Sequence, residues 1–298
     1  MSIDQLFNDL KQKYSDKLNF LDDKPEETLE STIAALWFMA FGNPISAESA
    51  IEMPLPELTD AQIELLNKLL IERVYNKPLA HITGRQRFMG IDFICDSRAL
   101  IPRKETEILG RKALDISLQF AQKDNQVVVI DVCCGAGNLG LAIAIHNPAT
   151  IVHATDISQD AVDLTGENIS FLNMGHRVIA EQGDLFSSVE NDKYISKTNL
   201  IVCNPPYIST GKVKIMNSEI LGKEPTLAFD GGMFGTKIIQ KLIVEAPIFL
   251  KKDGWLVFEV GAGQGDFILK LCQRSDLYNK VEPIYDGNGQ IRVISAMK

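Results

Sequence analysis

A short polar segment ends an apolar run in the last third of the chain, Leu200-Ile201-Val202-Cys203-Asn204-Pro205-Pro206-Tyr207-Ile208. The apolar part predicts a buried strand, and the polar part begins where that strand ends. Pro205 and Pro206 stiffen the backbone and lack N–H groups, so the local main chain offers carbonyl acceptors. Asn204 adds a side-chain acceptor and Tyr207 an aromatic face. Two oxygens and a ring suit a planar group that carries an NH2, although a rigid turn after a core strand is the alternative.

A second candidate site is the glycine-rich segment Asp131-Val132-Cys133-Cys134-Gly135-Ala136-Gly137-Asn138-Leu139-Gly140. Gly135, Gly137 and Gly140 match the fingerprint G-x-G-x-x-G, and Asp156 stands at the end of the next expected strand. By itself this pattern is compatible with NAD, with S-adenosylmethionine, or with a tight turn that binds nothing.

The position of Asp131 favours S-adenosylmethionine. Its carboxylate stands at the strand end just before the glycines, where it would repel a pyrophosphate but attract a cationic amino-acid group. Gly135, Ala136 and Gly137 let the backbone approach the ligand closely, and the following helix N-terminus can receive the ligand's carboxylate. Asp156 would then accept hydrogen bonds from the ribose hydroxyls. Its alternative role is to cap the helix that begins near Ser158.

A third segment, Gly183-Asp184-Leu185-Phe186, closes the next expected strand. Asp184 is placed to accept from the adenine amino group while Leu185 and Phe186 cover the ring, and a solvated turn is the alternative for the acid. Open α/β sheets bind ligands at the carboxyl ends of their strands, so four such segments at successive strand ends favour a ligand more than any one alone. We therefore expect S-adenosylmethionine as the cofactor, with Asn204 also contacting it.

Beyond residue 126 the chain alternates between strands and helices, which predicts a parallel α/β sheet. Only the turn sequence Asp286-Gly287-Asn288-Gly289 and one further residue separate the last two expected strands, so the final strand should run antiparallel to its neighbour. Helices are expected near residues 138–146, 158–172, 233–250 and 265–274. The seven expected strands are Val127–Val132, Ile151–Thr155, Arg177–Ala180, Asn199–Cys203, Trp255–Val260, Val281–Tyr285 and Ile291–Ala296.

The first part of the chain predicts helices separated by prolines. Ser2, Ser46 and Thr59 are candidate capping residues, and a further helix is expected from Glu26 to Phe41. Alternating residues around a glycine over residues 87–94 predict a hairpin, and a helix should follow residue 107. We expect a helical substrate-docking domain over residues 1–78, a β-hairpin linker over 79–102 and a catalytic domain over 103–298.

Charge and composition exclude several classes of partner. The formal net charge of the 298 residues is −9, and residues 1–78 carry seven Lys and Arg against fourteen Asp and Glu. Such an acidic segment repels phosphate backbones, so no direct contact with nucleic acid is expected. The absence of a long apolar run or a signal-peptide layout predicts a cytoplasmic protein with no membrane contact. Five cysteines without C-x-x-C spacing favour reduced thiols, and four scattered histidines predict no metal site.

The segment Asn204–Tyr207 resembles the Asn/Asp-Pro-Pro-Tyr signature of S-adenosylmethionine-dependent methyltransferases that act on amide or exocyclic amine nitrogens. Nearly the whole chain resembles the HemK-type methyltransferases, which methylate the glutamine side-chain amide in the Gly-Gly-Gln loop of peptide chain release factors. Besides the helical domain, the hairpin and the segments above, the resemblance rests on Ile101–Glu107, Glu224–Gly232, Gly263–Gly265 and Gly287–Arg292.

This resemblance implies a Rossmann-like class I S-adenosylmethionine-dependent methyltransferase domain and a release factor as the protein partner. It implies that Asn204, Pro205 and Tyr207 are catalytic and, with Pro206, hold the substrate glutamine. Three places depart from the family pattern. Lys104 replaces a usual proline, Cys133 and Cys134 replace small or hydroxyl residues, and residues 209–223 carry a basic cluster that could alter partner choice, namely Lys212, Lys214 and Lys223.

Three alternatives stay open. One is a methyltransferase of the same fold that acts on another protein amide or on a small-molecule amide or amine; transfer to a cell extract but not to a release factor would favour it. Another is a non-catalytic module, which binding of S-adenosylmethionine without any turnover would support. The third is an NAD-dependent dehydrogenase that uses the glycine loop, which stabilisation by a nicotinamide cofactor would support.

Overall fold

The computed structural model describes residues 2–208, 223–229, 231–232 and 235–298. The described part of the chain divides into two compact units, the first formed by residues 2–97, 101–104 and 223–224 and the second by the rest. Lys212 and Lys214 of the predicted basic cluster lie outside the described residues. In the described parts of the chain, no helix is both long and apolar enough to cross a membrane.

The first unit is built mainly from short helices, as expected. They are α1 (Ile3–Tyr14), α2 (Leu29–Phe41), α3 (Ala47–Ile51), α4 (Asp60–Val74) and α5 (Leu79–Thr83). The side chains of Ser2, Ser46 and Thr59 each accept a backbone N–H of the following helix, which confirms these three predicted caps. The predicted start of the second helix at Glu26 is wrong. Thr28 and Ser31 form a capping box there, which begins the helix at Leu29.

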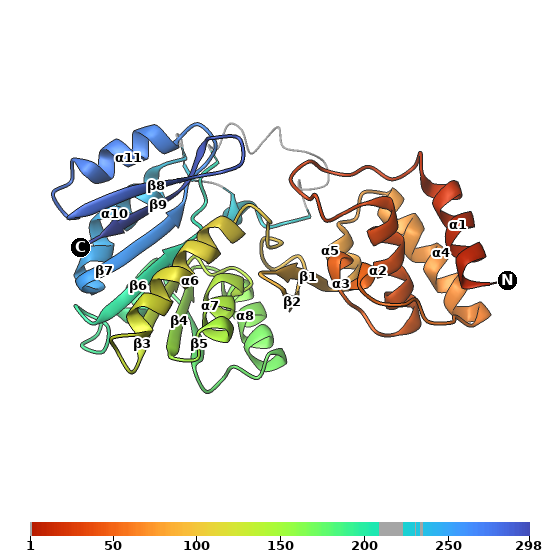
Figure 1. Cartoon of the computed structure of the whole chain (residues 1–298), viewed down its shortest axis with the longest axis horizontal. Helices are drawn as coiled ribbons and strands as arrows, with labels where there is room; N and C mark the ends of the chain where they lie inside the picture. Colours follow the sequence, from red (N-terminus) through yellow and green to blue (C-terminus); the bar gives the residue numbers. More distant parts are fainter. Residues whose placement is uncertain (1, 209–222, 230, 233–234) are drawn as a thin grey trace. The chain divides into compact units, whose positions relative to one another are not determined.

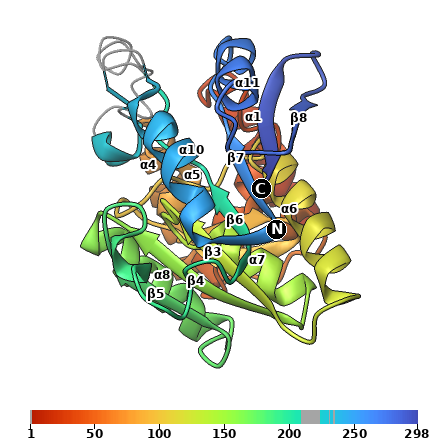
Figure 2. The same ribbon diagram turned by 90° about the vertical axis from the view of Figure 1, so that its left-hand side faces the viewer.

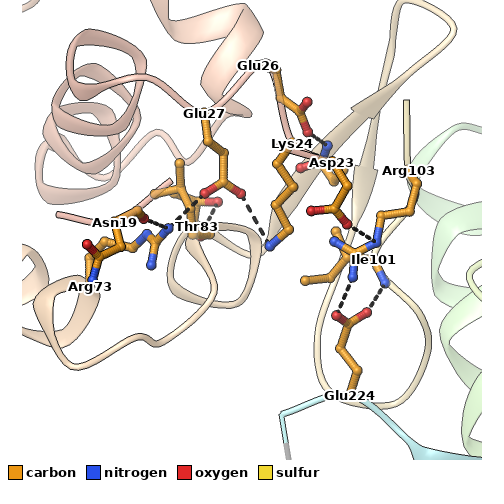
Figure 3. Close-up of polar contacts among 12 residues, drawn as sticks. Asn19, Asp23, Lys24, Glu26, Glu27, Arg73, Thr83, Ile101, Arg103 and Glu224 are labelled. Carbon is orange, nitrogen blue, oxygen red and sulfur yellow. Dashed lines mark hydrogen bonds and ion pairs between the residues drawn. The ribbon is translucent and has the colours of Figure 1, made fainter. Parts of the chain in front are cut away.

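The core of the first unit lies between α1, α2 and α4, where Leu36, Trp37, Leu66 and Leu70 are almost fully buried. A buried ion cluster lies in the same unit (Figure 3). Glu27 accepts Arg73 Nη2 at 3.1 Å, and its other oxygen lies 3.6 Å from Lys24 Nζ. Buried charges are tolerated when they are paired, so this cluster fixes the segment before α2 against α4.

The predicted hairpin is confirmed as β1 (Arg85–Phe88) paired antiparallel with β2 (Ile91–Ile94). The division of the chain places it with the helices of the first unit, whereas the sequence suggested a separate linker. Lys104, which departs from the family pattern, pairs with Glu48 of α3 at 2.6 Å within this unit.

The second unit contains a seven-stranded sheet, and each predicted strand is found within a few residues of its expected bounds. The strands are β3 (Val127–Val132), β4 (Thr150–Asp156), β5 (Val178–Gln182), β6 (Thr198–Cys203), β7 (Leu250–Glu259), β8 (Lys280–Tyr285) and β9 (Ile291–Met297). Their spatial order is β5-β4-β3-β6-β7-β9-β8, and β9 runs antiparallel to both of its neighbours (Figure 1). The predicted antiparallel final strand is therefore confirmed.

Helices cover both faces of this sheet. They are α6 (Glu107–Ala121), α7 (Asn138–His146), α8 (Gln159–Phe171), α10 (Lys237–Phe249) and α11 (Gly265–Gln273). Figures 1 and 2 show α6 and α10 on opposite sides of the central strands. Every residue of β6 is buried, as the apolar run Leu200–Cys203 predicts; the strand itself begins two residues earlier, with the buried polar residues Thr198 and Asn199. The parallel strands β3, β4, β5 and β6 end at the same edge, and that edge carries the predicted site residues.

Candidate active site

Asp131 stands near the end of β3 and is completely buried. Its Oδ2 accepts the Gly140 N–H at 2.8 Å, which ties the carboxylate to the first turn of α7. Its Oδ1 is buried without a hydrogen-bond partner in the described structure. Burial raises the pKa of Asp131 to about 7. A buried acceptor with an unused oxygen is costly by itself, and a cationic ligand group would satisfy it.

Gly135 and Gly140 give the glycine loop two different properties. Gly135 has a φ of +57°, and a Cβ there would meet nothing closer than the Ala99 Cβ at 4.0 Å, so the backbone is open on that side. A Cβ at Gly140 would instead lie 2.8 Å from Val152 Cγ1 and 2.9 Å from Asp131 Oδ2. Gly140 therefore allows α7 to pack closely on the sheet, while Gly135 leaves room for a ligand.

Ala136 and Gly137, the other predicted cofactor contacts in this loop, are buried. The Ala136 carbonyl accepts Asn168 Nδ2 at 3.0 Å, and Gly137 takes the N-cap position of α7 with a φ of +77°. Both residues shape the loop that precedes the helix N-terminus. That terminus offers backbone N–H groups to a ligand carboxylate.

Asp156 lies at the end of β4, next to the glycine loop. Its Oδ2 accepts the Gly135 N–H at 3.0 Å and its Oδ1 accepts the Ser158 N–H at 3.0 Å. Burial raises the pKa of Asp156 above its ordinary value. The alternative role considered from the sequence, capping of α8, belongs to Ser158, whose side chain accepts the Ala161 N–H; Asp156 accepts the Ser158 N–H in the turn before the helix. Because each carboxylate oxygen can accept more than one donor, the same group can still receive a ribose hydroxyl.

The segment after β5 differs from expectation in two residues, Leu185 and Phe186, which were both expected to cover an adenine ring. Asp184 is exposed and pairs with Lys241 at 2.9 Å. Leu185 is 5% exposed and belongs to the core of the sheet. Phe186, expected to cover an adenine ring, is instead stacked on Phe249 inside that core, with ring centroids 4.6 Å apart. Leu185 and Phe186 therefore contribute to the core and do not cover a ligand ring.

Asn204 lies directly after β6, and its side chain reaches the start of α6. Its Nδ2 donates to Thr106 Oγ1 at 3.2 Å. Of its neighbours, Pro205 is buried, while Pro206 and Tyr207 are partly exposed. The four residues thus form a stiff segment beside the glycine loop, since β6 pairs directly with β3.

Tyr207 is held by hydrogen bonds at its side-chain hydroxyl and at its backbone carbonyl. Its hydroxyl donates to Glu259 Oε1 at 2.9 Å, and its carbonyl accepts Gln264 Nε2 at 2.9 Å. Glu259 is the last residue of β7 and is 2% exposed. Arg292 Nη2 lies 3.7 Å from Glu259 Oε1 and also forms an ion pair with Glu105. Burial beside this carboxylate raises the pKa of Tyr207, so the phenol stays protonated.

The chain returns to this segment after residue 222. The Ile208 N–H donates to the Phe229 carbonyl at 2.9 Å, and the Gly231 N–H donates to the Ile208 carbonyl at 2.8 Å. Glu224, which opens the Glu-Pro-Thr-Leu-Ala motif, accepts the Ile101 N–H at 2.8 Å and Arg103 Nη2 at 2.7 Å (Figure 3). Glu224 is thus held within the first unit, and Phe229 and Gly231 are held within the second.

Four residues of the site received no individual role from the sequence: Thr106, Glu259, Gln264 and Arg292. Three of them fall in segments that carried the family resemblance, Ile101–Glu107, Gly263–Gly265 and Gly287–Arg292. For Glu259 the sequence offers a weaker indication of a functional role, namely an acidic residue at the end of an apolar strand. Their proximity to Asn204 and Tyr207 depends on the tertiary fold.

The residues present fit S-adenosylmethionine. An unsatisfied buried oxygen of Asp131 suits a cationic amino group, the open side of Gly135 leaves room for the ligand, and the α7 N-terminus suits a carboxylate. Together, the strand order with its antiparallel β9 and this cradle at the end of β3 define a class I S-adenosylmethionine-dependent methyltransferase, and S-adenosylmethionine is its methyl donor.

Comparison with known proteins agrees with this class. The methyltransferase small domain family model matches residues 110–234. A solved structure of human methyltransferase 10 domain containing protein superposes with a TM-score of 0.51 at 17% identity, covering 70% of this chain and 88% of that one. That similarity supports the fold alone.

Sequence relatives define the family. The release factor glutamine methyltransferase of Geobacter sulfurreducens is 30% identical over 240 residues, covering 80% of this chain and 79% of the relative. The protein of the same description from Streptococcus pneumoniae is 32% identical over 232 residues, covering 76% and 79%. The chain belongs to the release factor glutamine methyltransferase family.

Proposed function

We propose that this chain transfers a methyl group from S-adenosylmethionine to the side-chain amide nitrogen of the glutamine in the Gly-Gly-Gln motif of cytoplasmic peptide chain release factors. The observation that carries the proposal is the fixed segment Asn204–Tyr207, placed beside the glycine loop by the pairing of β6 with β3. Family membership supplies the class of substrate.

A carboxamide nitrogen is a weak nucleophile because its lone pair is delocalised into the carbonyl. The Asn204 side-chain oxygen and the Pro205 carbonyl each accept one N–H of the substrate amide, which orients the nitrogen for attack. These acceptors also stabilise the positive charge that develops as the N–H bonds polarise. Tyr207 packs on the amide plane. The bound cofactor supplies an electrophilic methyl group on its sulfonium.

No protein base is required before the transfer. The N-methylated amide cation is strongly acidic, so it loses its extra proton to water once the new N–C bond has formed. Tyr207 does not take that proton, because its raised pKa keeps the phenol protonated and its hydroxyl already donates to Glu259.

Mass spectrometry of a release factor incubated with this protein and S-adenosylmethionine tests the proposal. We expect one added methyl, located on the Gly-Gly-Gln glutamine. The matched control is the same release factor with that glutamine replaced by glutamate, which should gain nothing. An unmethylated glutamine in the presence of bound cofactor would contradict the proposed substrate and leave the methyltransferase class intact.

The helical N-terminal part of the chain, predicted as residues 1–78, is proposed to dock the release factor. Support comes from its acidity, with twice as many acidic as basic residues, and from its compactness as a separate unit. Deletion of residues 1–75 should then weaken methylation of intact release factor far more than methylation of a short Gly-Gly-Gln peptide. An equal loss on both substrates would contradict a docking role.

A further inference from the structure

Thr106 occupies the N-cap position of α6, but its side chain makes no capping hydrogen bond to the helix. A threonine at this position ordinarily accepts a backbone N–H of the first turn. Here the hydroxyl contacts two side chains instead. It accepts Asn204 Nδ2 at 3.2 Å, and it hydrogen-bonds the carboxylate of Glu259. Thr106 is 2% exposed, so these contacts are shielded from water.

Glu259 fixes the direction of this chain of hydrogen bonds. An ionised carboxylate only accepts hydrogen bonds. It receives the hydroxyls of Tyr207 and Thr106, and the guanidinium of Arg292 lies 3.7 Å from its Oε1. Burial raises the pKa of Glu259, whereas these donors and Arg292 favour the ionised form.

The Thr106 hydroxyl has one proton, and that proton goes to Glu259. Its oxygen can therefore only accept from Asn204, which requires the NH2 end of the Asn204 side chain to face Thr106. The carbonyl end, Oδ1, is then left pointing away from Thr106. A reversed amide would place Oδ1 against an oxygen that has no proton to give, which leaves two acceptors in contact.

We propose that Thr106, backed by Glu259, is a positioning residue that sets the orientation of the Asn204 side-chain amide, so that Oδ1 is the atom offered to the substrate N–H. This inference rests on the proposed role of Asn204 in binding the substrate amide. It assigns Thr106 a role in methyl transfer and none in cofactor binding.

The test compares Thr106→Val, which keeps the shape but loses the hydroxyl, with Thr106→Ser, which keeps the hydroxyl. We measure kcat and KM with a Gly-Gly-Gln peptide, and the dissociation constant of S-adenosylmethionine by calorimetry. Thr106→Val should lower kcat roughly 10- to 100-fold, because the amide is free to present its NH2 to the substrate. Its cofactor dissociation constant should stay within about threefold of the wild-type value, and Thr106→Ser should keep kcat within about threefold.

Equal losses of kcat in the valine and serine variants would show that Thr106 acts by packing, which overturns the inference. So would an unchanged kcat in Thr106→Val. Both results require a wild-type enzyme that methylates the peptide, so they are distinct from a failure of the proposed function, in which the wild-type enzyme itself leaves the glutamine unmodified.

A second measurement observes the Asn204 side chain in the wild-type protein itself. In wild-type protein labelled with ¹⁵N-asparagine, the Asn204 side-chain amide should show one proton protected from exchange, since Nδ2 donates to buried Thr106. The signal is assigned by its absence in Asn204→Asp. Two equally exchanging protons on that amide would overturn the proposed orientation.

Discussion

The two halves of the candidate site are held together in different ways. In the cofactor half, at the ends of β3 and β4, carboxylates accept backbone N–H groups that are close in sequence. Asp131 and Gly140 are nine residues apart, and Asp156 is two residues from Ser158 and 21 from Gly135. In the substrate half, at the ends of β6 and β7, side chains contact side chains that are distant in sequence. Asn204 and Thr106 are 98 residues apart, and Tyr207 and Glu259 are 52 apart.

This difference indicates what each half has to do. A cofactor cradle needs a backbone of defined shape, and short-range hydrogen bonds to main-chain groups provide that shape. A site that aligns a poor nucleophile needs side-chain oxygens in a fixed orientation, and buried partners from other elements provide that. We therefore expect substitutions in the two halves to have separable effects on cofactor binding and on methyl transfer.

The largest expected effect is on methyl transfer by Asn204→Ala. Loss of the side-chain oxygen removes one of two acceptors for the substrate amide, and we expect kcat with a Gly-Gly-Gln peptide to fall about 10²- to 10³-fold. The control is Asn288→Ala, at an exposed turn between β8 and β9, which should retain wild-type turnover. Near-normal turnover in Asn204→Ala would remove the basis of the mechanism.

Asp156→Ala should show the converse pattern. Its carboxylate orders the glycine loop through Gly135 and is predicted to accept the ribose hydroxyls. We expect the dissociation constant of S-adenosylmethionine to rise roughly 10- to 100-fold in calorimetry, since a partly buried carboxylate acceptor is lost. Asp163→Ala, an exposed acid on α8, is the control. Wild-type cofactor affinity in Asp156→Ala would contradict the assignment of Asp156 to the ribose hydroxyls.

Asp131→Asn should raise stability at high pH while weakening cofactor binding. The ordinary pKa of an aspartate is 3.8 and that of folded Asp131 is about 7, so the folded chain holds a proton that the unfolded chain releases. The wild-type free energy of unfolding therefore falls as pH rises from about 4 to 7. In urea titrations, the advantage of the asparagine variant should grow by on the order of 2 kcal/mol between pH 5 and pH 8.

Parallel pH profiles for the Asp131→Asn variant and the wild type would mean that the pKa of Asp131 is not raised. Asparagine keeps an acceptor for the Gly140 N–H, so the loop should stay in place. A variant that gained stability and also bound S-adenosylmethionine with wild-type affinity would show that the Asp131 carboxylate does not engage the cofactor's amino group.

The smallest expected effect is that of Tyr207→Phe. The ring can still pack on the substrate amide, so kcat should fall only a few-fold, while the free energy of unfolding should drop by about 1–2 kcal/mol because buried Glu259 loses a donor. Tyr278→Phe is the matched control, because its hydroxyl donates to a neutral carbonyl, that of Ile243, at 2.8 Å. We expect the free energy of unfolding to fall more in Tyr207→Phe than in Tyr278→Phe, because a buried carboxylate loses more than a neutral carbonyl when its donor is removed. A larger fall in Tyr278→Phe would contradict this.

The same contrast explains how much the sequence could predict. The strands, the antiparallel β9, the capped helices and the glycine loop follow from local patterns, and all of them are found. Phe186 was misread because apolar residues at strand ends look alike whether they face a ligand or the core. Thr106 and Glu259 received no role, because their significance arises from contacts made only when α6, β6 and β7 pack together.

The separation of the two halves of the site is tested most directly by the affinity of the Asn204→Ala variant for S-adenosylmethionine. Asn204 was also expected to contact the cofactor, yet its side-chain amide is held by Thr106. Calorimetry should give a dissociation constant within about threefold of the wild-type value, alongside the loss of turnover. A tenfold or greater loss of cofactor affinity would show that the Asn204 side chain belongs to both halves, and would contradict the account.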